Sequence, residues 1–153
     1  MNRREQIEMT ASELSAFLAE QRTLIVSSNG PDGYPHVVPM WYTLVNGELA
    51  FWTYSKAQKT VNLRRDPRIT CLLEAGDTYT ELRGAQIKGT AVLDDDEASA
   101  LRVGIALHER NYGGPLTPEL RRKVERQATK RTVVVVKALR VASWDHRKLG
   151  GEY

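Results

Sequence analysis

Residues 23–54 read TLIVSSNGPDGYPHVVPMWYTLVNGELAFWTY, and this stretch carries the strongest signal for a fold. Its first five residues, TLIVS, are mostly β-branched or apolar and predict a strand. The segment NGPDG over 29–33 follows, and its glycine, proline, asparagine and aspartate residues favour a turn. We therefore predict a second strand over 34–45 that runs back antiparallel to the first.

A second turn follows at Asn46-Gly47. Both residues tolerate the positive φ angles of a type I′ turn, which predicts a tight hairpin into a third strand over 48–54. Consecutive hairpins are typical of antiparallel sheets, and no Gly-x-Gly-x-x-Gly sequence follows a strand. The stretch thus predicts an antiparallel sheet rather than a parallel nucleotide-binding fold.

The rest of the chain alternates between strand and helix signals. Further strands are predicted over 68–74, 80–93 and 132–137, with 141–144 continuing or following the last of them. Helices are predicted to begin at Thr10, after Ser55, near Asp94 and at Thr117-Pro118, and to end at Asp66-Pro67 and Gly113-Gly114. Gly84 and Gly89 are the expected bend points of the long strand 80–93. Six strands with flanking helices predict one α+β domain, residues 1–153, built around an antiparallel barrel.

The bulk composition excludes several classes of protein. The 153 residues can bury a core unaided, and the single cysteine, Cys71, excludes an internal disulfide and a cysteine-rich metal site. The histidines at 36, 108 and 146 lack the spacing of metal ligands, and no serine stands in a Gly-x-Ser-x-Gly sequence. No apolar segment suits a signal peptide or a membrane span, so we expect a cytoplasmic protein that does not bind membranes. A net charge of only +3 makes nucleic acid an unfavourable partner.

Hydroxyl and ammonium groups gather where the third predicted strand meets the following helix. Thr53, Ser55, Lys56 and Lys59 lie within this junction. Free N–H groups and the dipole at a helix start favour a phosphate, and a lysine adds a point charge. The segment 53–60 therefore predicts a phosphate site. A solvated basic helix with ordinary caps explains the same residues equally well.

Two other segments combine aromatic and polar residues. In 37–42, Pro39 interrupts a strand, so the strand lies at a sheet edge or is bulged there, and unpaired backbone groups can face a planar ring. The alternative is that Pro39 only marks an edge and that Trp41 is a core residue. In 143–149, Trp144 could cover a ligand, although chain ends more often have no function.

Together these segments resemble the split-barrel family of pyridoxamine-phosphate-oxidase-like proteins. The most specific matching motif is Lys-Thr-x-Asn-Leu-Arg-Arg-Asp-Pro over 59–67, and the segments 23–27, 33–42 and 143–149 extend the match over nearly the whole chain. Within the family, the chain is similar to a branch that uses coenzyme F420, an 8-hydroxy-5-deazaflavin. The resemblance implies a six-stranded antiparallel split β-barrel, the FMN-binding split barrel, and a homodimer with the cofactor in a groove at its interface.

The resemblance also assigns residues to the site. The resemblance implies that the backbone of residues 38–41 meets the ring system of the cofactor. It also implies that residues 53–60 hold the phosphate of the cofactor. Two further residues are implied to reach the cofactor from the partner subunit. The full implied set is Val38, Pro39, Met40, Trp41, Thr53, Ser55, Lys56, Lys59, Thr60, Gln86 and Trp144.

The activity implied by the resemblance is hydride transfer from coenzyme F420 to a conjugated small molecule. Such a cofactor carries the hydride itself, so the protein need only bind, orient and exclude water, in agreement with the lack of an acid–base constellation. Two alternatives remain: an FMN-dependent oxidoreductase of the same fold, and a non-catalytic carrier of a cofactor or haem-type ligand. The sequence identifies no catalytic residue; a proton could come from Tyr42, His36 or water. Basic clusters at 64–68 and 121–123 are candidates for the polyanionic tail of the deazaflavin.

Overall fold

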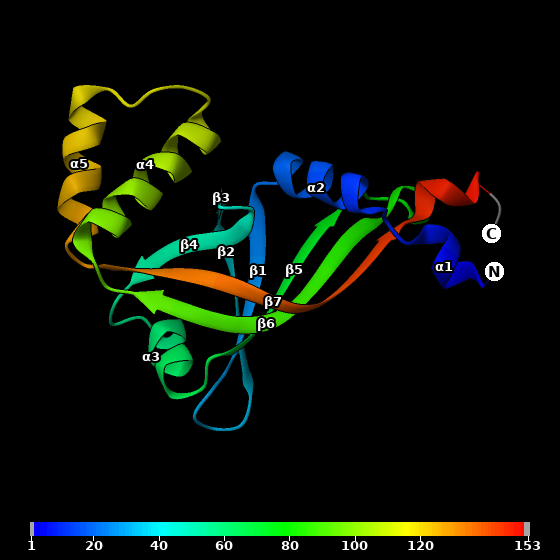
Figure 1. The fold of residues 1–153 in the computed structure, drawn as a ribbon, viewed down its shortest axis with the longest axis horizontal. Coiled ribbons are helices and arrows are strands. Elements are labelled where there is room, and N and C mark those ends of the chain that lie inside the picture. Colours follow the sequence, from blue (N-terminus) through cyan, green and yellow to red (C-terminus); the bar gives the residue numbers. More distant parts are fainter. Residues whose placement is uncertain (1, 152–153) are drawn as a thin grey trace.

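A computed structural model describes residues 2–151. Seven strands form one antiparallel sheet in the order β2-β1-β5-β6-β7-β4-β3, and the sheet curls into a half-barrel (Figure 1). The strands are β1 (Thr23–Asn29), β2 (Pro35–Trp41), β3 (Thr43–Val45), β4 (Glu48–Tyr54), β5 (Arg68–Ala75), β6 (Arg83–Asp94) and β7 (Arg131–Asp145). The helices are α1 (Arg3–Ile7), α2 (Ala11–Glu20), α3 (Gln58–Arg65), α4 (Glu97–Tyr112) and α5 (Pro118–Ala128), with 3-10 turns at Tyr79–Glu81 and His146–Leu149. The predicted α+β split barrel with flanking helices is confirmed.

The sheet has seven strands rather than six because the chain changes edges at Tyr42. β2 pairs with β1, and β3 pairs with β4, which places β2 and β3 at opposite edges of the sheet. Between them, Tyr42 is fully buried, and its hydroxyl donates a hydrogen bond of 2.6 Å to the carbonyl of Leu18 in α2. The prediction of one strand over 34–45 was therefore wrong. The break depends on a contact with α2, which the local alternation of residues does not encode.

The two longest strands, β6 and β7, are bent by one extra residue. Lys88 pairs with Arg140, whereas Gly89 pairs with Ala138, so Leu139 has no opposite residue. A Cβ at Gly89 would lie 2.3 Å from a backbone carbonyl oxygen of β7, so only glycine permits this close approach. The predicted bend at Gly89 is confirmed, and the segment 141–144 continues the strand 132–137 beyond the bulge.

Most predicted ends of elements are also confirmed. Thr10 forms a capping box with Glu13 at the start of α2, and Thr117 caps α5. Gly113 adopts a left-handed conformation with φ 76° and ends α4. β6 begins at Arg83 rather than at residue 80, because the preceding residues form a 3-10 turn.

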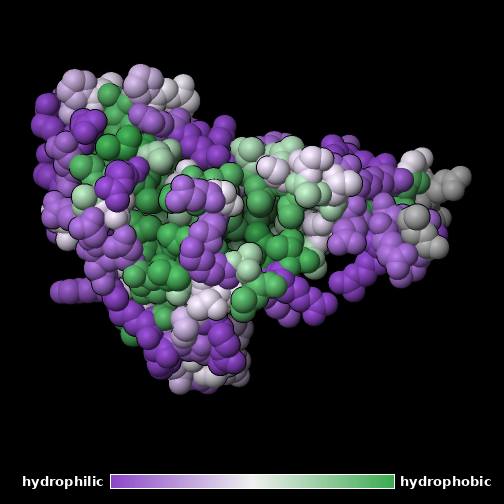
Figure 2. All heavy atoms as spheres, in the orientation of Figure 1, coloured by the Kyte–Doolittle hydropathy of each residue, from purple (hydrophilic) through white to green (hydrophobic). Residues whose placement is uncertain are grey.

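Buried side chains form two clusters on opposite sides of the sheet. One fills the inside of the curl, where Phe17 of α2 closes it. The other lies on the outer side of β4 and β7, where Trp52 and Val133 pack against α4 and α5. Figure 2 shows apolar side chains gathered in the middle of the molecule and hydrophilic ones around the outer side of the α4–α5 pair. Among residues 2–151, no helix is long and apolar enough to span a membrane.

Candidate functional site

The end of β4 and the start of α3 bring four of the predicted phosphate residues together. Thr53 is fully buried and accepts a hydrogen bond of 3.2 Å from Nζ of Lys59. The hydroxyl of Thr60 donates to the carbonyl of Tyr54 at 2.7 Å, which fixes α3 against the strand. The backbone N–H of Ser55 bonds to the chain just before β7. Local hydrogen bonds therefore hold the strand end and the helix start in one rigid junction.

The first turn of α3 leaves its backbone N–H groups open. Its N-cap residue is Ala57, whose side chain cannot accept a hydrogen bond. Within the described chain, no hydrogen bond uses the N–H groups of residues 58–60, which lie at the positive end of the helix dipole. The helix thus lacks the ordinary N-cap that is expected if the segment is only a solvated basic helix. Lys56 is exposed in the preceding turn, and its side chain makes no hydrogen bond or ion pair within residues 2–151.

Arg131, the first residue of β7, completes the junction and is absent from the set predicted from sequence. It pairs with Tyr54 across the sheet, and its guanidinium lies 3.7 Å from the centre of the Tyr54 ring and 4.9 Å from that of Trp52. Its Nε is buried and has no hydrogen-bond partner in residues 2–151. The sequence pattern did not identify Arg131 because its position depends on the long-range pairing of β4 with β7. We call the group Thr53, Ser55, Lys59, Thr60 and Arg131 the anion cradle.

The two cations of the anion cradle, Lys59 and Arg131, have no carboxylate partner in the described part of the chain. Burial lowers the pKa of Lys59 below its ordinary value, and the charge of Arg131 lowers it further. Burial also lowers the pKa of Arg131. Two half-buried like charges without a counter-ion among the described residues make this junction a candidate for binding an anion.

One carboxylate approaches the anion cradle, but it is already bound. The hydroxyl of Thr132 donates to Asp95 at 2.6 Å and lies 2.9 Å from the hydroxyl of Ser55. Asp95 also forms an ion pair of 2.6 Å with Arg64, whose hydrogen bond holds the pKa of Asp95 below its usual value. The Arg64–Asp95 pair is neutral, so the positive charges of Lys59 and Arg131 remain uncompensated.

The predicted ring-binding residues lie on β2, at an edge of the sheet. The position of β2 at one end of the strand order confirms that Pro39 marks an edge. Val38 and Met40 are half-buried toward the inside of the curl, whereas Pro39 and Trp41 are exposed on the outer face. Trp41 is 43% exposed, so its interpretation as a core residue is wrong, and the buried aromatic residue is Tyr42.

A row of aromatic rings links Trp41 to the anion cradle across α4. The ring centroids of Trp41 and Tyr112 are 5.7 Å apart, as are those of Tyr112 and His108. The His108 ring lies 6.3 Å from that of Trp52, over which the guanidinium of Arg131 is placed. The row therefore has β2, the strand predicted to meet the cofactor ring, at one end and the anion cradle at the other.

Gln86 and Trp144 lie on the outer face of the sheet, on the same side as Pro39. Pro39 pairs with Ile25, Ile25 with Leu72, and Leu72 with Gln86, so these side chains form one row across four strands. Neither Gln86 nor Trp144 makes a hydrogen bond or ring contact with the anion cradle among the residues described. The structure thus groups both residues with the outer face of β2 and not with the anion cradle.

Gly84 provides the seat for the indole ring of Trp144. A Cβ at Gly84 would lie 2.2 Å from an aromatic carbon of Trp144, closer than two carbons can approach. We expect Gly84→Ala to push the indole from the sheet and to lower the free energy of unfolding by about 1–3 kcal/mol. Urea unfolding and tryptophan fluorescence test this, with Gly114→Ala as the control, since no atom lies within 4 Å of a Cβ there. Unchanged stability and emission in Gly84→Ala would contradict this seat.

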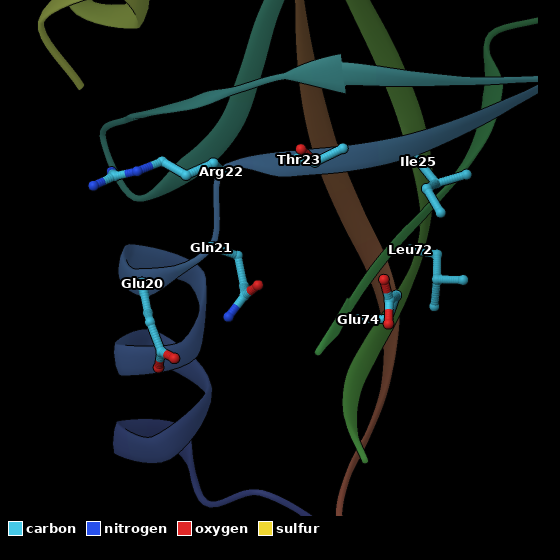
Figure 3. A pocket seen from close by; sticks show the side chains of 7 residues that line it. All are labelled: Glu20, Gln21, Arg22, Thr23, Ile25, Leu72 and Glu74. Atoms are coloured by element: carbon cyan, nitrogen blue, oxygen red, sulfur yellow. The ribbon is translucent and has the colours of Figure 1, made fainter. Parts of the chain in front are cut away.

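A hollow of about 280 Å³ opens on the same face, between the end of α2 and strands β1 and β5 (Figure 3). Ile25 and Leu72 supply apolar side chains from neighbouring strands, and Gln21 lies on the side of α2. Because Ile25 pairs with Pro39 and Leu72 with Gln86, the hollow lies between the predicted ring-binding strand and Gln86. It is the candidate space for a planar ligand or substrate on this face.

The structure removes Tyr42 from the candidate proton donors. Its hydroxyl proton is engaged with the carbonyl of Leu18, and burial raises the pKa of the phenol. A fully buried hydroxyl cannot reach a substrate in a surface groove. His36 is half-buried on β2, and its Nδ1 has no hydrogen-bond partner in residues 2–151.

Comparison with known proteins assigns the chain to a family. The family profile described as pyridoxamine 5′-phosphate oxidase matches residues 10–145. The crystal structure of the conserved hypothetical protein Rv2991 from Mycobacterium tuberculosis aligns with a TM-score of 0.90 at 43% identity, over 100% of this chain and 95% of that chain. No curated protein matches the chain significantly.

Two more distant structures share the fold. An F420 reductase aligns with a TM-score of 0.65 at 24% identity, over 83% of this chain and 94% of that chain. HutZ, described as the heme storage protein from Vibrio cholerae, aligns with a TM-score of 0.65 at 14% identity, over 86% of this chain and 92% of that chain. At these identities the likeness shows the fold alone.

Proposed function

Because the chain belongs to the pyridoxamine 5′-phosphate oxidase family, we propose that it is an oxidoreductase that binds coenzyme F420 and transfers hydride to a conjugated small molecule. The observation that carries this proposal is the anion cradle, where Lys59 and Arg131 place two half-buried positive charges without a counter-ion in residues 2–151. A phosphorylated cofactor would supply the missing negative charge.

The residues of the anion cradle fit a phosphate by their donors as well as their charge. The open N–H groups of residues 58–60 point from a helix start, where phosphates commonly bind. Lys59 adds an ammonium group, and Arg131 adds a guanidinium whose Nε has no other partner among the described residues. Thr53 and Thr60 already bond within the chain, so in this account they position Lys59 and α3.

The ring system belongs, in this proposal, against the backbone of β2 and the outer face of the sheet. This face carries exposed apolar side chains, with Val37 55% and Trp41 43% exposed. We propose that a second copy of the chain covers it and that the cofactor lies in the groove between the copies, where Gln86 and Trp144 would reach the ring from the partner. Sedimentation tests this: Val37→Asp should shift a dimer toward monomer, and a wild-type monomer would contradict the interface.

We prefer coenzyme F420 to FMN because the sequence resembles the branch of the family that uses the deazaflavin. An F420 reductase shares the fold, but so does a FAD-binding protein, so the fold itself does not choose between the cofactors. The anion cradle fits the phosphate of FMN as well, so an FMN-dependent oxidoreductase remains the alternative. A non-catalytic carrier, as HutZ is described to be for heme, would bind its ligand without any turnover.

When bound, the deazaflavin supplies the carbon that carries the hydride. The protein's own tasks are to anchor the phosphate through Lys59 and Arg131, to orient the ring through β2, and to exclude water by burying the groove. The hollow beside Ile25 and Leu72 would hold the substrate against the ring. His36 and water remain as proton sources, because Tyr42 is engaged in the core.

Purified protein tests the proposal by its cofactor and its turnover. We expect binding of coenzyme F420 at micromolar affinity or better, and oxidation of the reduced cofactor when an enone or quinone is added. A yellow preparation that binds FMN and ignores coenzyme F420 would favour the alternative. Tight binding without turnover of any such substrate would indicate a carrier, and binding of neither cofactor would refute both enzyme proposals.

The affinity for a phosphorylated cofactor should decline at high pH. Only protonated Lys59 attracts phosphate, and its pKa is lowered by burial and by Arg131. The affinity should therefore be constant below this lowered pKa and fall as the pH rises through it, before an ordinary lysine would titrate at about 10.4. Titrations from neutral pH to about pH 10 test this. The decline should be absent in Lys59→Met, and a decline of the same size in that variant would assign it to another group.

A further inference from the structure

A second group of unpaired cations lies on the outer face, apart from the anion cradle. Lys88 of β6 and Arg140 of β7 stand directly opposite one another in the sheet register. Both line a hollow of about 150 Å³, together with Arg4 of α1, Gln86 and Ala142. Among residues 2–151, no acidic residue lines this hollow, which we call the basic hollow.

The cations of the basic hollow differ from many others on the surface. Ion pairs elsewhere join Arg64–Asp95, Arg68–Asp66, Arg83–Glu20, Arg121–Glu125, Lys137–Glu48, Arg147–Asp145 and Lys148–Glu13. The basic clusters 64–68 and 121–123 are the sequence-based candidates for binding a polyanionic tail. Three of their arginines, Arg64, Arg68 and Arg121, are paired with carboxylates within the protein. The side chains of Arg4, Lys88 and Arg140 make no ion pair or hydrogen bond within residues 2–151. Like charges directly opposite on paired strands destabilise a sheet, so the fold gains nothing from Lys88 facing Arg140.

Two acids lie nearby without neutralising these cations. Glu5 and Glu8 line a neighbouring hollow that shares Arg4 and Arg140. The carboxylate of Glu5 accepts hydrogen bonds from Asn2 in the cap of α1. Neither glutamate forms an ion pair with a cation of the basic hollow in the described chain. The basic hollow therefore keeps its positive charge.

We propose that the basic hollow is a second anion site, which binds a phosphate or carboxylate group of a small-molecule ligand. Two guanidinium groups and one ammonium group line this one hollow and supply hydrogen-bond donors for an oxyanion. Gln86 belongs to the row that crosses the sheet to Pro39, beside the hollow of Figure 3. In the proposed function, on which this last step rests, the substrate is an anionic molecule whose charged group is held here while its conjugated part faces the ring.

Inorganic phosphate is the probe for this site, titrated into ¹⁵N-labelled protein and followed by NMR. We expect saturable shifts of the backbone amides of Lys88 and Arg140, separate from those of residues 58–60 in the anion cradle. Lys88→Gln with Arg140→Gln should weaken the first set by roughly ten-fold or more and leave the second set unchanged. Lys59→Met should do the reverse. Arg102→Gln with Arg126→Gln, which removes two exposed charges of α4 and α5, is the matched control and should change neither set.

The possible results separate this site from the proposed function. Saturable NMR shifts at residues 58–60 without saturable shifts at Lys88 and Arg140 would overturn the second site and leave the cofactor proposal intact. Saturation at Lys88 and Arg140 in a protein that binds no cofactor would keep the second site and refute the proposed function. A carboxylate of a second copy of the chain could instead occupy the basic hollow. In that case the Lys88→Gln, Arg140→Gln dimer will dissociate more readily in sedimentation, and phosphate will not saturate the hollow. This result would also overturn a ligand site.

Discussion

Replacing both cations of the anion cradle, Lys59→Met with Arg131→Met, should weaken binding of a phosphorylated flavin or deazaflavin by about 3 kcal/mol, roughly 100-fold. A hydrogen bond to a charged group contributes about 1.5–3 kcal/mol, and the two effects are not fully additive because the two cations interact with one another. Each single variant should therefore lose less than the double variant. Titration calorimetry with FMN and with coenzyme F420 measures the loss.

The stability of the same double variant separates a binding role from a structural one. Lys59 and Arg131 are partly desolvated, and each charge disfavours the other, so removing them relieves repulsion in the free protein. Methionine keeps an apolar stem against Tyr54 and Trp52. We expect a free energy of unfolding within about 1 kcal/mol of the wild type, because the relieved repulsion offsets the lost Lys59–Thr53 hydrogen bond and the lost cation–π contacts. A matching loss of stability would show that the cations are structural, and unchanged affinity would remove them from the site.

Arg110→Ala should lower the free energy of unfolding by about 2–3 kcal/mol, or the melting temperature by about 5–10 °C. Its guanidinium donates to the carbonyls of Leu18, Ala19 and Gln21 at 2.8–3.0 Å and lies 5.0 Å from the centre of the Tyr42 ring. These carbonyls end α2, where the helix leaves acceptors without partners and a positive charge is favourable. Loss of the side chain would leave the carbonyls of Ala19 and Gln21 without this partner, whereas the carbonyl of Leu18 keeps the hydroxyl of Tyr42.

A suitable control for Arg110 is Arg102, which is exposed on the same helix. Within residues 2–151, the side chain of Arg102 bonds only to the hydroxyl of Ser99, one turn away. We expect Arg102→Ala to change the free energy of unfolding by less than about 0.5 kcal/mol in the same urea titration. Equal stability of the two variants would contradict the role given to Arg110 in joining α4 to α2.

Local chemistry in the sequence predicts most ends of strands and helices. The capping box at Thr10, the positive φ at Asn46-Gly47 and the stop at Gly113 each depend on residues within one turn of the chain, and all three are confirmed. The break at Tyr42 could not be predicted in this way. It requires α2 to accept the tyrosine hydroxyl, and that contact joins residues 24 positions apart.

The candidate site likewise contains residues that the sequence predicts and residues that only the structure identifies. Thr53 to Thr60 form a continuous segment, so the sequence alone indicates their chemistry and their common place. Arg131 joins them only because β7 pairs with β4, and it looks like any basic residue before a strand. Gln86 lies in the basic hollow with Lys88 and Arg140, a grouping that follows from the register of β6 with β7. The sequence leaves out Arg131, Lys88 and Arg140, which reach their neighbours through long-range strand pairing.

The main proposal is that the anion cradle holds the phosphate of the cofactor, and the phosphate itself can be tested. Wild-type protein is titrated with coenzyme F420 and its dephosphorylated ribityl form, and with FMN and riboflavin. We predict that the phosphorylated form of the bound cofactor has an affinity roughly 100-fold higher than its counterpart, and that Lys59→Met with Arg131→Met abolishes this difference. Equal affinities of the two forms for the wild-type protein, or binding of none of the four molecules, would contradict the proposal.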